Sequence, residues 1–548
     1  MTGNWTDHLM IAPILLPLVA AGALLFMNER RHARKAMVSV GAVLGLLVVS
    51  IALLRSAAGT GPGQPAAMGV YLLGNWPAPF GIVLVVDRLS AMMLVLTSVL
   101  GLAALVFALA RWSKAGPYFH SLFLLLLMGL NGAFLTGDLF NLFVFFEVLL
   151  AASYGLVLHG SGLVRVKAGL HYIAINLASS FLFLIGVSLI YGVAGTLNMA
   201  DLAARIPTVA AEDRMMLEAG AALLGVAFLV KAGMWPLNFW LPTTYSAAAA
   251  PAAAMFAIMT KVGIYILLRL SLLLFGDGAG ASAGLGGDVL LIGGLATLSF
   301  GAIGVLASQA MGRLAGYSVL VSSGTLLAAI GIGNAGVTAG ALFYLVSSTL
   351  AICAFFLLIE LVERDQNPAA DILAVTMEAF GDDDDEEEAE EEVGIPFQAT
   401  MAILGIGFAG CALLLAGLPP LSGFIAKFAI LTAIFNPDGI GGGVLVSTVT
   451  WTFTALLILS GLSALIAMTR AGVRTFWAPV DRTVPRVHAV EIAPVAMLLL
   501  LCAVLTVAGG PVMEYMDETA RSLHAPEGYV DGVLTAAPIE GPAVGEGR

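Results

Sequence analysis

Residues 36–54 read AMVSVGAVLGLLVVSIALL, a run of nineteen residues without a charged side chain. A helix needs about 20 predominantly apolar residues to cross the hydrocarbon core of a bilayer, so this run is long enough to span a membrane. Residues 8–27 and 490–510 form similar runs, and 59% of the 548 residues are hydrophobic whereas 11% are charged. Soluble proteins carry roughly 25% charged residues. The sequence therefore predicts an all-α polytopic membrane protein.

Apolar runs separated by charged or Gly/Pro-rich breaks predict fourteen transmembrane helices. Their expected spans are residues 9–27, 36–54, 81–110, 117–136, 138–158, 169–193, 218–238, 251–275, 286–307, 313–333, 338–362, 397–434, 447–469 and 489–510. Cytoplasmic loops collect Lys and Arg. Fourteen such residues fall in the odd-numbered loops, whereas five fall in the even-numbered loops and the two tails. This bias predicts that both termini lie outside.

Several segments are expected to lie outside the membrane. Residues 55–80 are rich in Gly and Pro and are predicted to form a long outside loop, and residues 197–217 are predicted to form an amphipathic helix at the membrane surface. Residues 382–392 hold ten acidic side chains, so the segment 363–396 is predicted to be a solvated inside loop, with ion capture as the weaker alternative. The tail after residue 511 has few bulky apolar residues and is expected to be disordered.

Three lysines fall inside predicted helices, where a charge is costly. They are Lys231, Lys261 and Lys427. An ionised side chain at the bilayer centre costs about 2.5–3.5 kcal/mol on insertion scales, and such residues usually serve ion or proton movement. Burial favours the neutral form of a lysine, so modest changes around it can load or release a proton, whereas arginine stays charged. The lysines are therefore predicted to relay protons, and Arg88 and Arg269 to anchor or pair.

Glu147 is an acid in an otherwise apolar predicted helix. A buried carboxylate needs a proton or a partner, because an opposite charge a few ångströms away offsets much of the desolvation cost. Lys231 is the predicted partner. Two interpretations stay open here: a purely structural ion pair between two helices, or a pair whose strength changes during transport and so controls the protonation of Lys231. Glu360 is a second intramembrane acid, close to the inside end of its helix.

Prolines interrupt two predicted helices, 7 and 12, beside these lysines. Proline removes a backbone donor and clashes with the preceding turn, and in a membrane the carbonyls that lose their partners are tolerated only beside a wet cavity or inside protein. The residues concerned are Pro236, Pro242 and Pro251 after Lys231, and Pro419, Pro420 and Gly423 before Lys427. Two breaks at matching places of the chain indicate a transport site between inverted repeats.

The repeats are expected to be helices 4–8 and helices 9–13. Because five is an odd number, tandem copies enter the membrane in opposite orientations. The expected organisation is N-terminal helices in residues 1–110, a first repeat in 111–275, a second repeat with the acidic loop in 276–470, and a final helix with the tail in 471–548.

The sequence shows no motif for a cofactor. It has no phosphate-binding loop, CxxCH haem attachment or iron–sulfur cysteine pattern, and no nucleophile–histidine arrangement stands out. Neither a cofactor nor a nucleic-acid partner is therefore expected. Three classes stay open: a translocator energised by an ion gradient, a translocator subunit driven by redox chemistry elsewhere, and a passive scaffold. The scaffold explains none of the buried lysines.

Four motifs, in order, resemble the antiporter-like subunits shared by Mrp-type (Mnh, Sha or Pha) cation/proton antiporters and respiratory complex I. They are GDLFNLFVFFEVLLAASYGLVLHG (137–160), LVKAGMWPLNFWLPTTYSAAAAP (229–251), KVGIYILLRL (261–270) and GLPPLSGFIAKF (417–428). The resemblance covers about residues 80–470, and the first two motifs are most similar to the D-type subunit of the Mrp antiporters. It implies a fourteen-helix fold and a proton path along Glu147, Lys231, Lys261 and Lys427.

The resemblance also implies a secondary transporter subunit rather than an enzyme, in the bacterial inner membrane. It would exchange cytoplasmic Na⁺ or K⁺ for external protons together with the large A-type subunit and the small subunits of the antiporter. The alternative is a proton-pumping membrane subunit of a complex I-like redox enzyme. A cation prefers several oxygen ligands, whereas this axis is mostly lysine. The chain is therefore expected to carry the proton, and a neighbouring subunit the cation.

One position departs from the complex I relatives, which commonly carry histidine in helix 11. This chain reads LFYLVSSTLAICAFF over residues 342–356, with Ser347 and Ser348 at that place. A hydroxyl can order water but does not hold a proton at neutral pH. The step between Lys261 and Lys427 is therefore predicted to use bound water and the serine pairs 322–323 and 347–348.

Overall fold

The computed structural model describes residues 7–59, 68–364, 397–437, 447–477 and 487–538. The acidic tract and residues 539–548 of the tail lie outside the described residues, and so do the predictions made for them. The helices are α1 (Ala12–Leu25), α2 (His32–Ala58), α3 (Arg88–Ala110), α4 (Phe119–Leu135), α5 (Leu139–Leu158), α6 (Leu163–Ala194), α7 (Met199–Arg205), α8 (Ala211–Ala232), α9 (Leu241–Ala247), α10 (Ala250–Phe275), α11 (Gly287–Ala307), α12 (Met311–Ile332), α13 (Ala335–Glu363), α15 (Phe397–Ala416), α16 (Ser422–Phe435), α17 (Thr448–Gly472), α18 (Ala489–Val507), α19 (Gly509–His524) and α20 (Glu527–Leu534).

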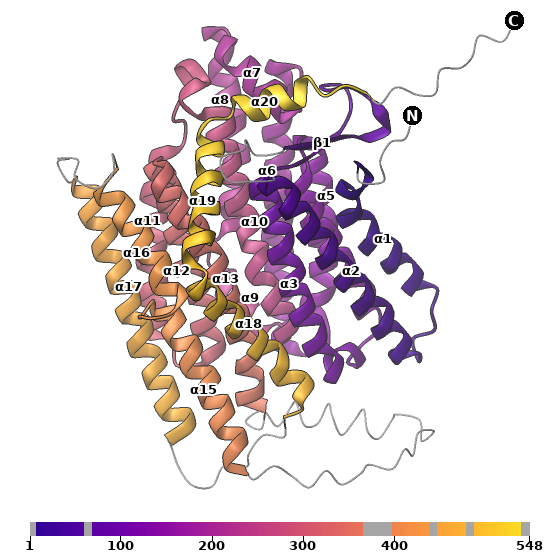
Figure 1. Ribbon diagram of the computed structural model, residues 1–548, viewed down its shortest axis with the longest axis vertical. Coiled ribbons are helices and arrows are strands. Elements are labelled where there is room, and N and C mark those ends of the chain that lie inside the picture. Colours follow the sequence, from indigo (N-terminus) through magenta and orange to yellow (C-terminus); the bar gives the residue numbers. More distant parts are fainter. Residues whose placement is uncertain (1–6, 60–67, 365–396, 438–446, 478–486, 539–548) are drawn as a thin grey trace, which may run out of the picture.

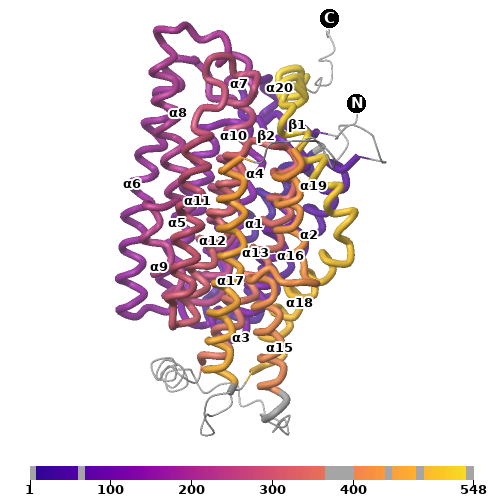
Figure 2. Tube along the Cα trace, turned by 90° about the vertical axis from the view of Figure 1, so that its left-hand side faces the viewer, coloured from indigo at the N-terminus to yellow at the C-terminus, as the bar shows by residue number. Residues whose placement is uncertain are grey.

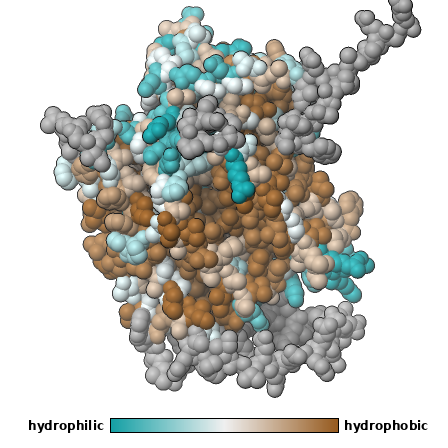
Figure 3. Space-filling model, in the orientation of Figure 1, coloured by the Kyte–Doolittle hydropathy of each residue, from teal (hydrophilic) through white to brown (hydrophobic). Residues whose placement is uncertain are grey.

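The predicted number of membrane crossings agrees with the helices of the described residues. Eleven of these helices are long and apolar enough to cross a membrane, and α1, α4, α15 and α16 are shorter apolar helices. Because α15 and α16 follow one another across one break, they make a single interrupted crossing, and the bundle has fourteen. A broad apolar band crosses the middle of the face seen in Figure 3, with hydrophilic residues above it. The chain is a multi-pass membrane protein whose helices satisfy their own backbone groups, as a bilayer requires.

The two ends of the bundle differ in what they carry. A two-stranded sheet, β1 (Gly69–Leu72) and β2 (Val83–Val86), lies at one end together with α7 and α20 (Figure 1). We call this the hairpin end. The opposite end, where α3, α5 and α13 finish, carries Arg111, Arg165 and Arg364, and we call it the basic end.

The centre of the bundle is α13. It packs against α10, α12, α15, α16, α18 and α19, and 94% of its most apolar stretch is buried. In the view of Figure 2, α6 and α8 form one flank and α15, α16 and α17 form another part of the outside. Polar side chains on α10, α12 and α13 therefore face protein rather than lipid.

Two predicted segments fold differently. Within the predicted outside loop 55–80, residues of β1 pair antiparallel with β2, from Gly69 opposite Val86 to Leu72 opposite Val83. The prediction of a single surface helix over residues 197–217 is wrong. It divides into the short helix α7, capped by the side chain of Asn198, and the first turns of α8. Met199, Ala200 and Leu202 are buried whereas Ala204 and Arg205 are exposed, so one face of α7 packs against the protein and the other is open.

The prediction of a disordered tail is wrong for the described part of it. Residues 509–534 form α19 and α20. Along α19, Met516, Thr519, Ala520 and Leu523 are buried, a spacing of three and four residues that gives a helix one apolar face. That face packs against α13. The low hydrophobicity of the tail concealed a strongly one-sided helix.

Candidate functional site

Four helices carry the charged residues of the predicted path. Glu147 lies near the middle of α5, Lys231 in the last turn of α8, Lys261 near the middle of α10 and Lys427 in the second turn of α16. The lysines are 8%, 0% and 8% exposed in that order, and Glu147 is half-buried. These helices are connected by a series of contacts: α5 packs on α6, α6 on α8, α8 on α10, α10 on α12, α12 on α13, and α13 on α16. The four residues therefore lie along one continuous series of packed helices.

Lys231 is bound by a neutral side chain. Its Nζ donates a hydrogen bond of 2.7 Å to Oδ1 of Asn176 on α6. The amide Nδ2 of Asn176 in turn donates to the carbonyl of Tyr172, also at 2.7 Å, which fixes the amide oxygen toward the lysine. The ammonium also lies 5.8 Å from the centre of the Phe146 ring.

Glu147 and Lys231, the predicted partners, do not form a direct ion pair. None of the ion pairs among the described residues joins them; instead, Oε1 of Glu147 accepts a 2.5 Å hydrogen bond from the hydroxyl of Ser180. Asn176 and Ser180 are four residues apart on α6, so they share one face of that helix and stand between the acid and the base. The Glu147 carboxylate still acts electrostatically on Lys231. The pair was predicted from charge alone. In the structure a neutral amide, that of Asn176, binds Lys231, and a hydroxyl, that of Ser180, binds Glu147.

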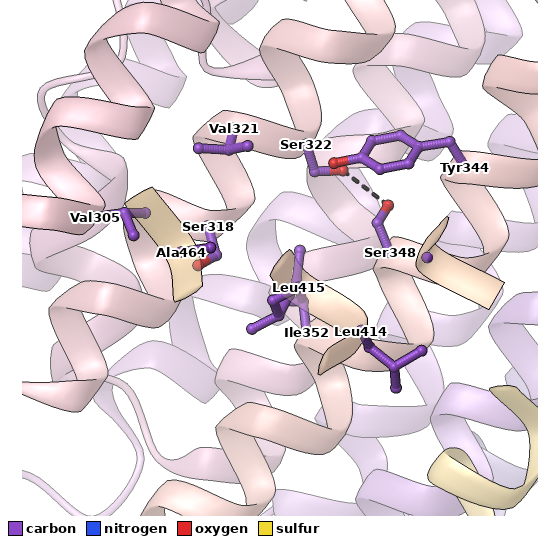
Figure 4. Close-up of a pocket in the computed structure, with 11 residues that line it drawn as sticks. Val305, Ser318, Val321, Ser322, Tyr344, Ser348, Ile352, Leu414, Leu415 and Ala464 are labelled. Atoms are coloured by element: carbon purple, nitrogen blue, oxygen red, sulfur yellow. Dashed lines mark hydrogen bonds between the residues drawn. The ribbon is translucent and has the colours of Figure 1, made fainter. Parts of the chain in front are cut away.

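Lys261 points toward hydroxyl groups of the second half of the chain. Its Nζ donates to Oγ of Ser322 on α12 at 2.7 Å, and Ser322 Oγ lies 2.9 Å from Oγ of Ser348 on α13. Figure 4 shows this serine pair beside Tyr344. The side chain of Lys261 is fully buried, so the ammonium depends on these protein groups and on any water near them.

The two neighbouring serines of α13 have different partners. Ser348 meets Ser322, whereas Ser347 Oγ lies 2.8 Å from Oγ of Ser422 at the start of α16. Consecutive helical side chains point about 100° apart, so the pair reaches two different neighbouring helices. The predicted hydroxyls therefore lie between the helix of Lys261 and the helix of Lys427.

Lys427 forms its hydrogen bond at the predicted break of helix 12. α15 ends at Ala416 and α16 begins at Ser422, with Pro419 and Pro420 between them. The carbonyl of Ala416 accepts a 3.0 Å hydrogen bond from Lys427 Nζ. Gly423 lets the two halves approach, since a Cβ there would lie 2.2 Å from the carbonyl oxygen of Leu414. A carbonyl at the interrupted end of one half-helix thus binds the lysine of the other.

The break of helix 7 also lies where the prolines predict it. α8 ends one residue after Lys231, and residues 233–240, which include Pro236, join it to α9. The backbone N–H of Trp235 donates to Oγ1 of Thr297 on α11 at 2.8 Å. Pro242 and Pro251 stand in the first turns of α9 and α10, where a helix does not need the missing N–H.

A small cavity connects the serine pair to the second break. Its lining includes Ser318, Ser322, Tyr344 and Ser348, together with Leu414 of α15 and Gly423 of α16 (Figure 4). About 20 Å³ of it is open to the centres of water molecules, and one water needs roughly 10–15 Å³. The cavity therefore has room for a water beside the serine hydroxyls, close to the ends of α15 and α16 that flank the second break.

The buried arginines pair with acids, as predicted. Nη2 of Arg269 lies 2.8 Å from Asp87 Oδ2, and Arg88 forms an ion pair with Glu518 of α19. Both pairs lie near the hairpin end, away from the lysines. These arginines fasten α10, α3 and α19 to one another.

Sequence reasoning missed Asn176 and Ser180. Both lie in HYIAINLASSFLFLIG (171–186), an apolar stretch of α6 with no charge after its first residue. Two polar side chains four residues apart in such a stretch were the available signal. Among the described residues, no group of three or more His, Cys, Asp or Glu side chains is placed to hold a metal ion.

Known proteins are similar to this chain in sequence and in fold. Residues 136–454, which include all four charged positions, match the family described as NADH:quinone oxidoreductase/Mrp antiporter, TM. A protein of Rhizobium meliloti (strain 1021), named as the probable D-type subunit of a K(+)/H(+) antiporter, is 62% identical over 97% of this chain and 98% of its own length. The D-type subunit of the Na(+)/H(+) antiporter of Alkalihalophilus pseudofirmus is 34% identical over 96% of this chain and 99% of its own length.

A solved structure has the same architecture. One chain of the Mrp complex from Dietzia sp. DQ12-45-1b superposes with a TM-score of 0.81 at 25% identity, over 97% of this chain and 100% of that chain. The similarity extends over nearly the whole of both chains.

Proposed function

Because the chain belongs to the NADH:quinone oxidoreductase/Mrp antiporter family of membrane subunits, we propose that it is the D-type subunit of a multisubunit monovalent cation/proton antiporter. Its partners in this proposal are the other membrane subunits of the complex, the large A-type subunit among them. The observation that carries the proposal is the buried series of polar groups from Glu147 through three lysines, with hydroxyls and a water-sized cavity between the last two.

In the proposed mechanism, protons move along this series while each lysine alternates between charged and neutral forms. Burial makes the neutral form accessible, and the partners Asn176, Ser322 and the Ala416 carbonyl accept a hydrogen bond from either form. Glu147 acts on Lys231 across α6 and sets how firmly it holds a proton. Because Ser322, Ser348 and the small cavity lead toward the second break, water completes the step to Lys427.

The proposed location is the bacterial cell membrane, with the basic end in the cytoplasm and both termini outside. The excess of Lys and Arg at that end supports this orientation. The positions of the two interrupted helices, one after Lys231 and one before Lys427, support the proposal of two inverted five-helix repeats.

The proposed exchange takes cytoplasmic cation out and external protons in. The axis offers lysines rather than a cage of oxygen ligands, so in this proposal the cation passes through a neighbouring subunit. The 62% identical relative is named as part of a K(+)/H(+) antiporter, and potassium is therefore the first cation to test. The names of both relatives favour the antiporter over a redox-driven proton pump.

The proposal is tested with the chain expressed together with its co-encoded neighbours. In everted vesicles with an imposed proton gradient, addition of K⁺ or Na⁺ should collapse the gradient. Glu147→Ala should abolish this response and Glu147→Asp should retain part of it, because aspartate keeps a carboxylate near Ser180. Normal exchange by Glu147→Ala at an equal membrane level would make the acid purely structural. Co-purification of quinone- or flavin-binding subunits would support the redox alternative.

A further inference from the structure

The C-terminal helices of the chain cover the hairpin end of the bundle. α19 runs along α13 toward that end, and α20 lies across it beside α7 and β1 (Figure 1). At the last residue of α19, Nε2 of His524 lies 3.1 Å from Oγ1 of Thr338, near the start of α13. We call α19 and α20 together the clasp.

The first contact of the clasp is with Arg88, the first residue of α3. Its guanidinium pairs with the carboxylate of Glu518 on α19 and lies over the ring of Tyr515 at 5.4 Å. The Tyr515 hydroxyl donates to the Arg88 carbonyl at 2.7 Å. Nη2 of Arg88 also donates to the carbonyl of Ala58, the last residue of α2, at 2.8 Å. One arginine thus joins α19 to the hairpin ends of two membrane-spanning helices.

The second contact is with the neighbouring ion pair of Asp87 and Arg269. Nη2 of Arg269 donates to both carboxylate oxygens of Asp87, at 2.8 and 2.9 Å. The Arg269 guanidinium lies over the ring of Tyr265 on its own helix at 5.2 Å and over the ring of Tyr529 on α20 at 5.3 Å. The clasp therefore contacts Arg88 directly and the preceding residue, Asp87, through its ion-pair partner.

The third contact is apolar. Val533 of α20 forms a small cluster with two residues of β2 and one of α7, namely Val83, Val85 and Ala200. All four are buried. The hydroxyl of Tyr529 also approaches the turn before α5, since a Cβ at Gly137 would lie 3.3 Å from it. α20 is therefore held on the sheet, on α7 and beside the start of α5.

Beneath the clasp, a line of polar groups leads to the relay. Lys261, Tyr265 and Arg269 are four residues apart on α10, so they share one face of that helix. Nε of Arg269 donates to the Tyr265 hydroxyl at 3.0 Å, and this hydroxyl donates to the carbonyl of Phe134, near the end of α4, at 2.7 Å. Tyr265 and Arg269 are 2% and 4% exposed. Water that reached the Tyr265 hydroxyl would stand about one helical turn from Lys261.

A transporter whose buried lysines met water from both ends at once would let protons cross without the cation. We propose that the clasp seals the hairpin end above Lys261 and so prevents protons from crossing the chain without cation exchange. Tyr529 is the clasp side chain that covers the Asp87–Arg269 pair. This inference rests on the proposed antiport function and adds a closing element to it.

Tyr529→Ala tests the seal through proton leak. The full complex is placed in liposomes with an imposed pH difference, with choline in place of Na⁺ and K⁺ and a permeant anion for charge balance. Decay of the pH difference should be about tenfold faster than in wild type, which corresponds to about 1.4 kcal/mol of lost closure. Tyr529→Phe keeps a ring over Arg269 and should leak as little as wild type. The matched control is Tyr71→Ala on β1, whose ring contacts His8.

A second measurement reports directly whether water enters. Leu268 lies on the same face of α10 as Tyr265 and Arg269 and is 4% exposed. A cysteine introduced as Leu268→Cys should be protected from a membrane-impermeant maleimide added at the hairpin end, and Tyr529→Ala should make it reactive. The three native cysteines are buried and give a low background.

Wild-type leak in Tyr529→Ala, or continued protection of the introduced cysteine, overturns the clasp as a seal. An equal leak in Tyr71→Ala overturns it too, because that result would show a general loosening of the hairpin end. The leak is measured without an exchangeable cation, so it does not depend on the exchange assay. Absence of K⁺- or Na⁺-dependent exchange in the wild-type complex refutes the proposed function, whereas normal exchange with wild-type leak in Tyr529→Ala refutes the clasp alone.

Discussion

Lys231 is hydrogen-bonded to Asn176, at 2.7 Å, and not to the acid that charge complementarity assigns to it. A neutral amide can accept a hydrogen bond from the lysine in its charged or its neutral form, whereas a carboxylate in direct contact would hold the proton on the lysine. With Ser180 bound to Glu147 on the same face of α6, the acid influences the lysine from a distance. This arrangement suits a group that must release its proton.

Asn176→Ala should therefore slow exchange. It leaves a buried donor without its acceptor, which costs about 1–3 kcal/mol, and a change of about 1.4 kcal/mol corresponds to tenfold in rate. We expect flux in vesicles to fall about tenfold or more. Asn176→Asp should be impaired as well, because a carboxylate at that place would hold Lys231 charged. Asn131→Ala on α4, which loses a 3.0 Å bond to the Pro13 carbonyl, is the control, and an equal loss in both would show a general stability effect.

The Ser322–Ser348 pair should act as a unit. Ser322→Ala removes both the acceptor of Lys261 and the partner of Ser348, so flux should fall about tenfold on the same 1–3 kcal/mol cost. Ser348→Ala should be impaired, and the double variant should lose less than the product of the two single effects, since contacting residues are not additive. Ser460→Ala on α17, a buried serine bonded to its own helix at 2.8 Å, should behave as wild type. Multiplicative losses would contradict a shared proton step.

Gly461→Ala tests the space around Lys427 without changing a charge. A Cβ at this α17 position would lie 2.6 Å from the Ala416 carbonyl oxygen and 3.3 Å from Lys427 Nζ. Overpacking of this kind costs about 1–3 kcal/mol, and here it displaces the acceptor of the lysine, so flux should fall while assembly persists. In Gly225→Ala on α8 the new Cβ meets nothing within 4 Å, and flux should be unchanged. If the two variants exchange equally well, the Ala416 carbonyl is dispensable.

The sequence predicted the number of crossings and the two breaks because both have strong local causes. Long apolar runs indicate spanning helices by their length alone, and prolines such as Pro236 and Pro420 remove backbone donors wherever they stand. The helix α19 was not predictable from average hydrophobicity, because the helix is stabilised by one buried face and by the ion pair of Glu518 with Arg88. The β1–β2 pairing likewise depends on contacts between distant residues.

The site was predictable at the level of residue type and not of partner. Lys231, Lys261 and Lys427 stand out because a charge in an apolar helix is rare. Their partners do not, because Asn176 and Ser322 are ordinary polar residues, and only the packing of α6 on α8 and of α10 on α12 brings them within reach. The Ala416 carbonyl is invisible in sequence, since every residue has one.

The last prediction separates a proton relay at Lys427 from an anchor. Arginine keeps the positive charge and can donate to the Ala416 carbonyl, but it does not release a proton near neutral pH. If Lys427 titrates during transport, Lys427→Arg should lower flux at least about tenfold, and Lys427→Ala should do the same because the proton site is gone. Lys427→Glu should retain part of the flux, since desolvation shifts the pKa of a buried carboxylate toward neutral pH and its protonated form can donate to the same carbonyl.

An anchoring role for Lys427 predicts the opposite order of activities, with arginine tolerated and glutamate not. Vesicle assays at membrane levels matched by immunoblot, with co-purification of the neighbouring subunits as the check on assembly, decide between them. Near-normal flux in Lys427→Arg would exclude Lys427 as a titrating group and leave the proton path to Lys231 and Lys261.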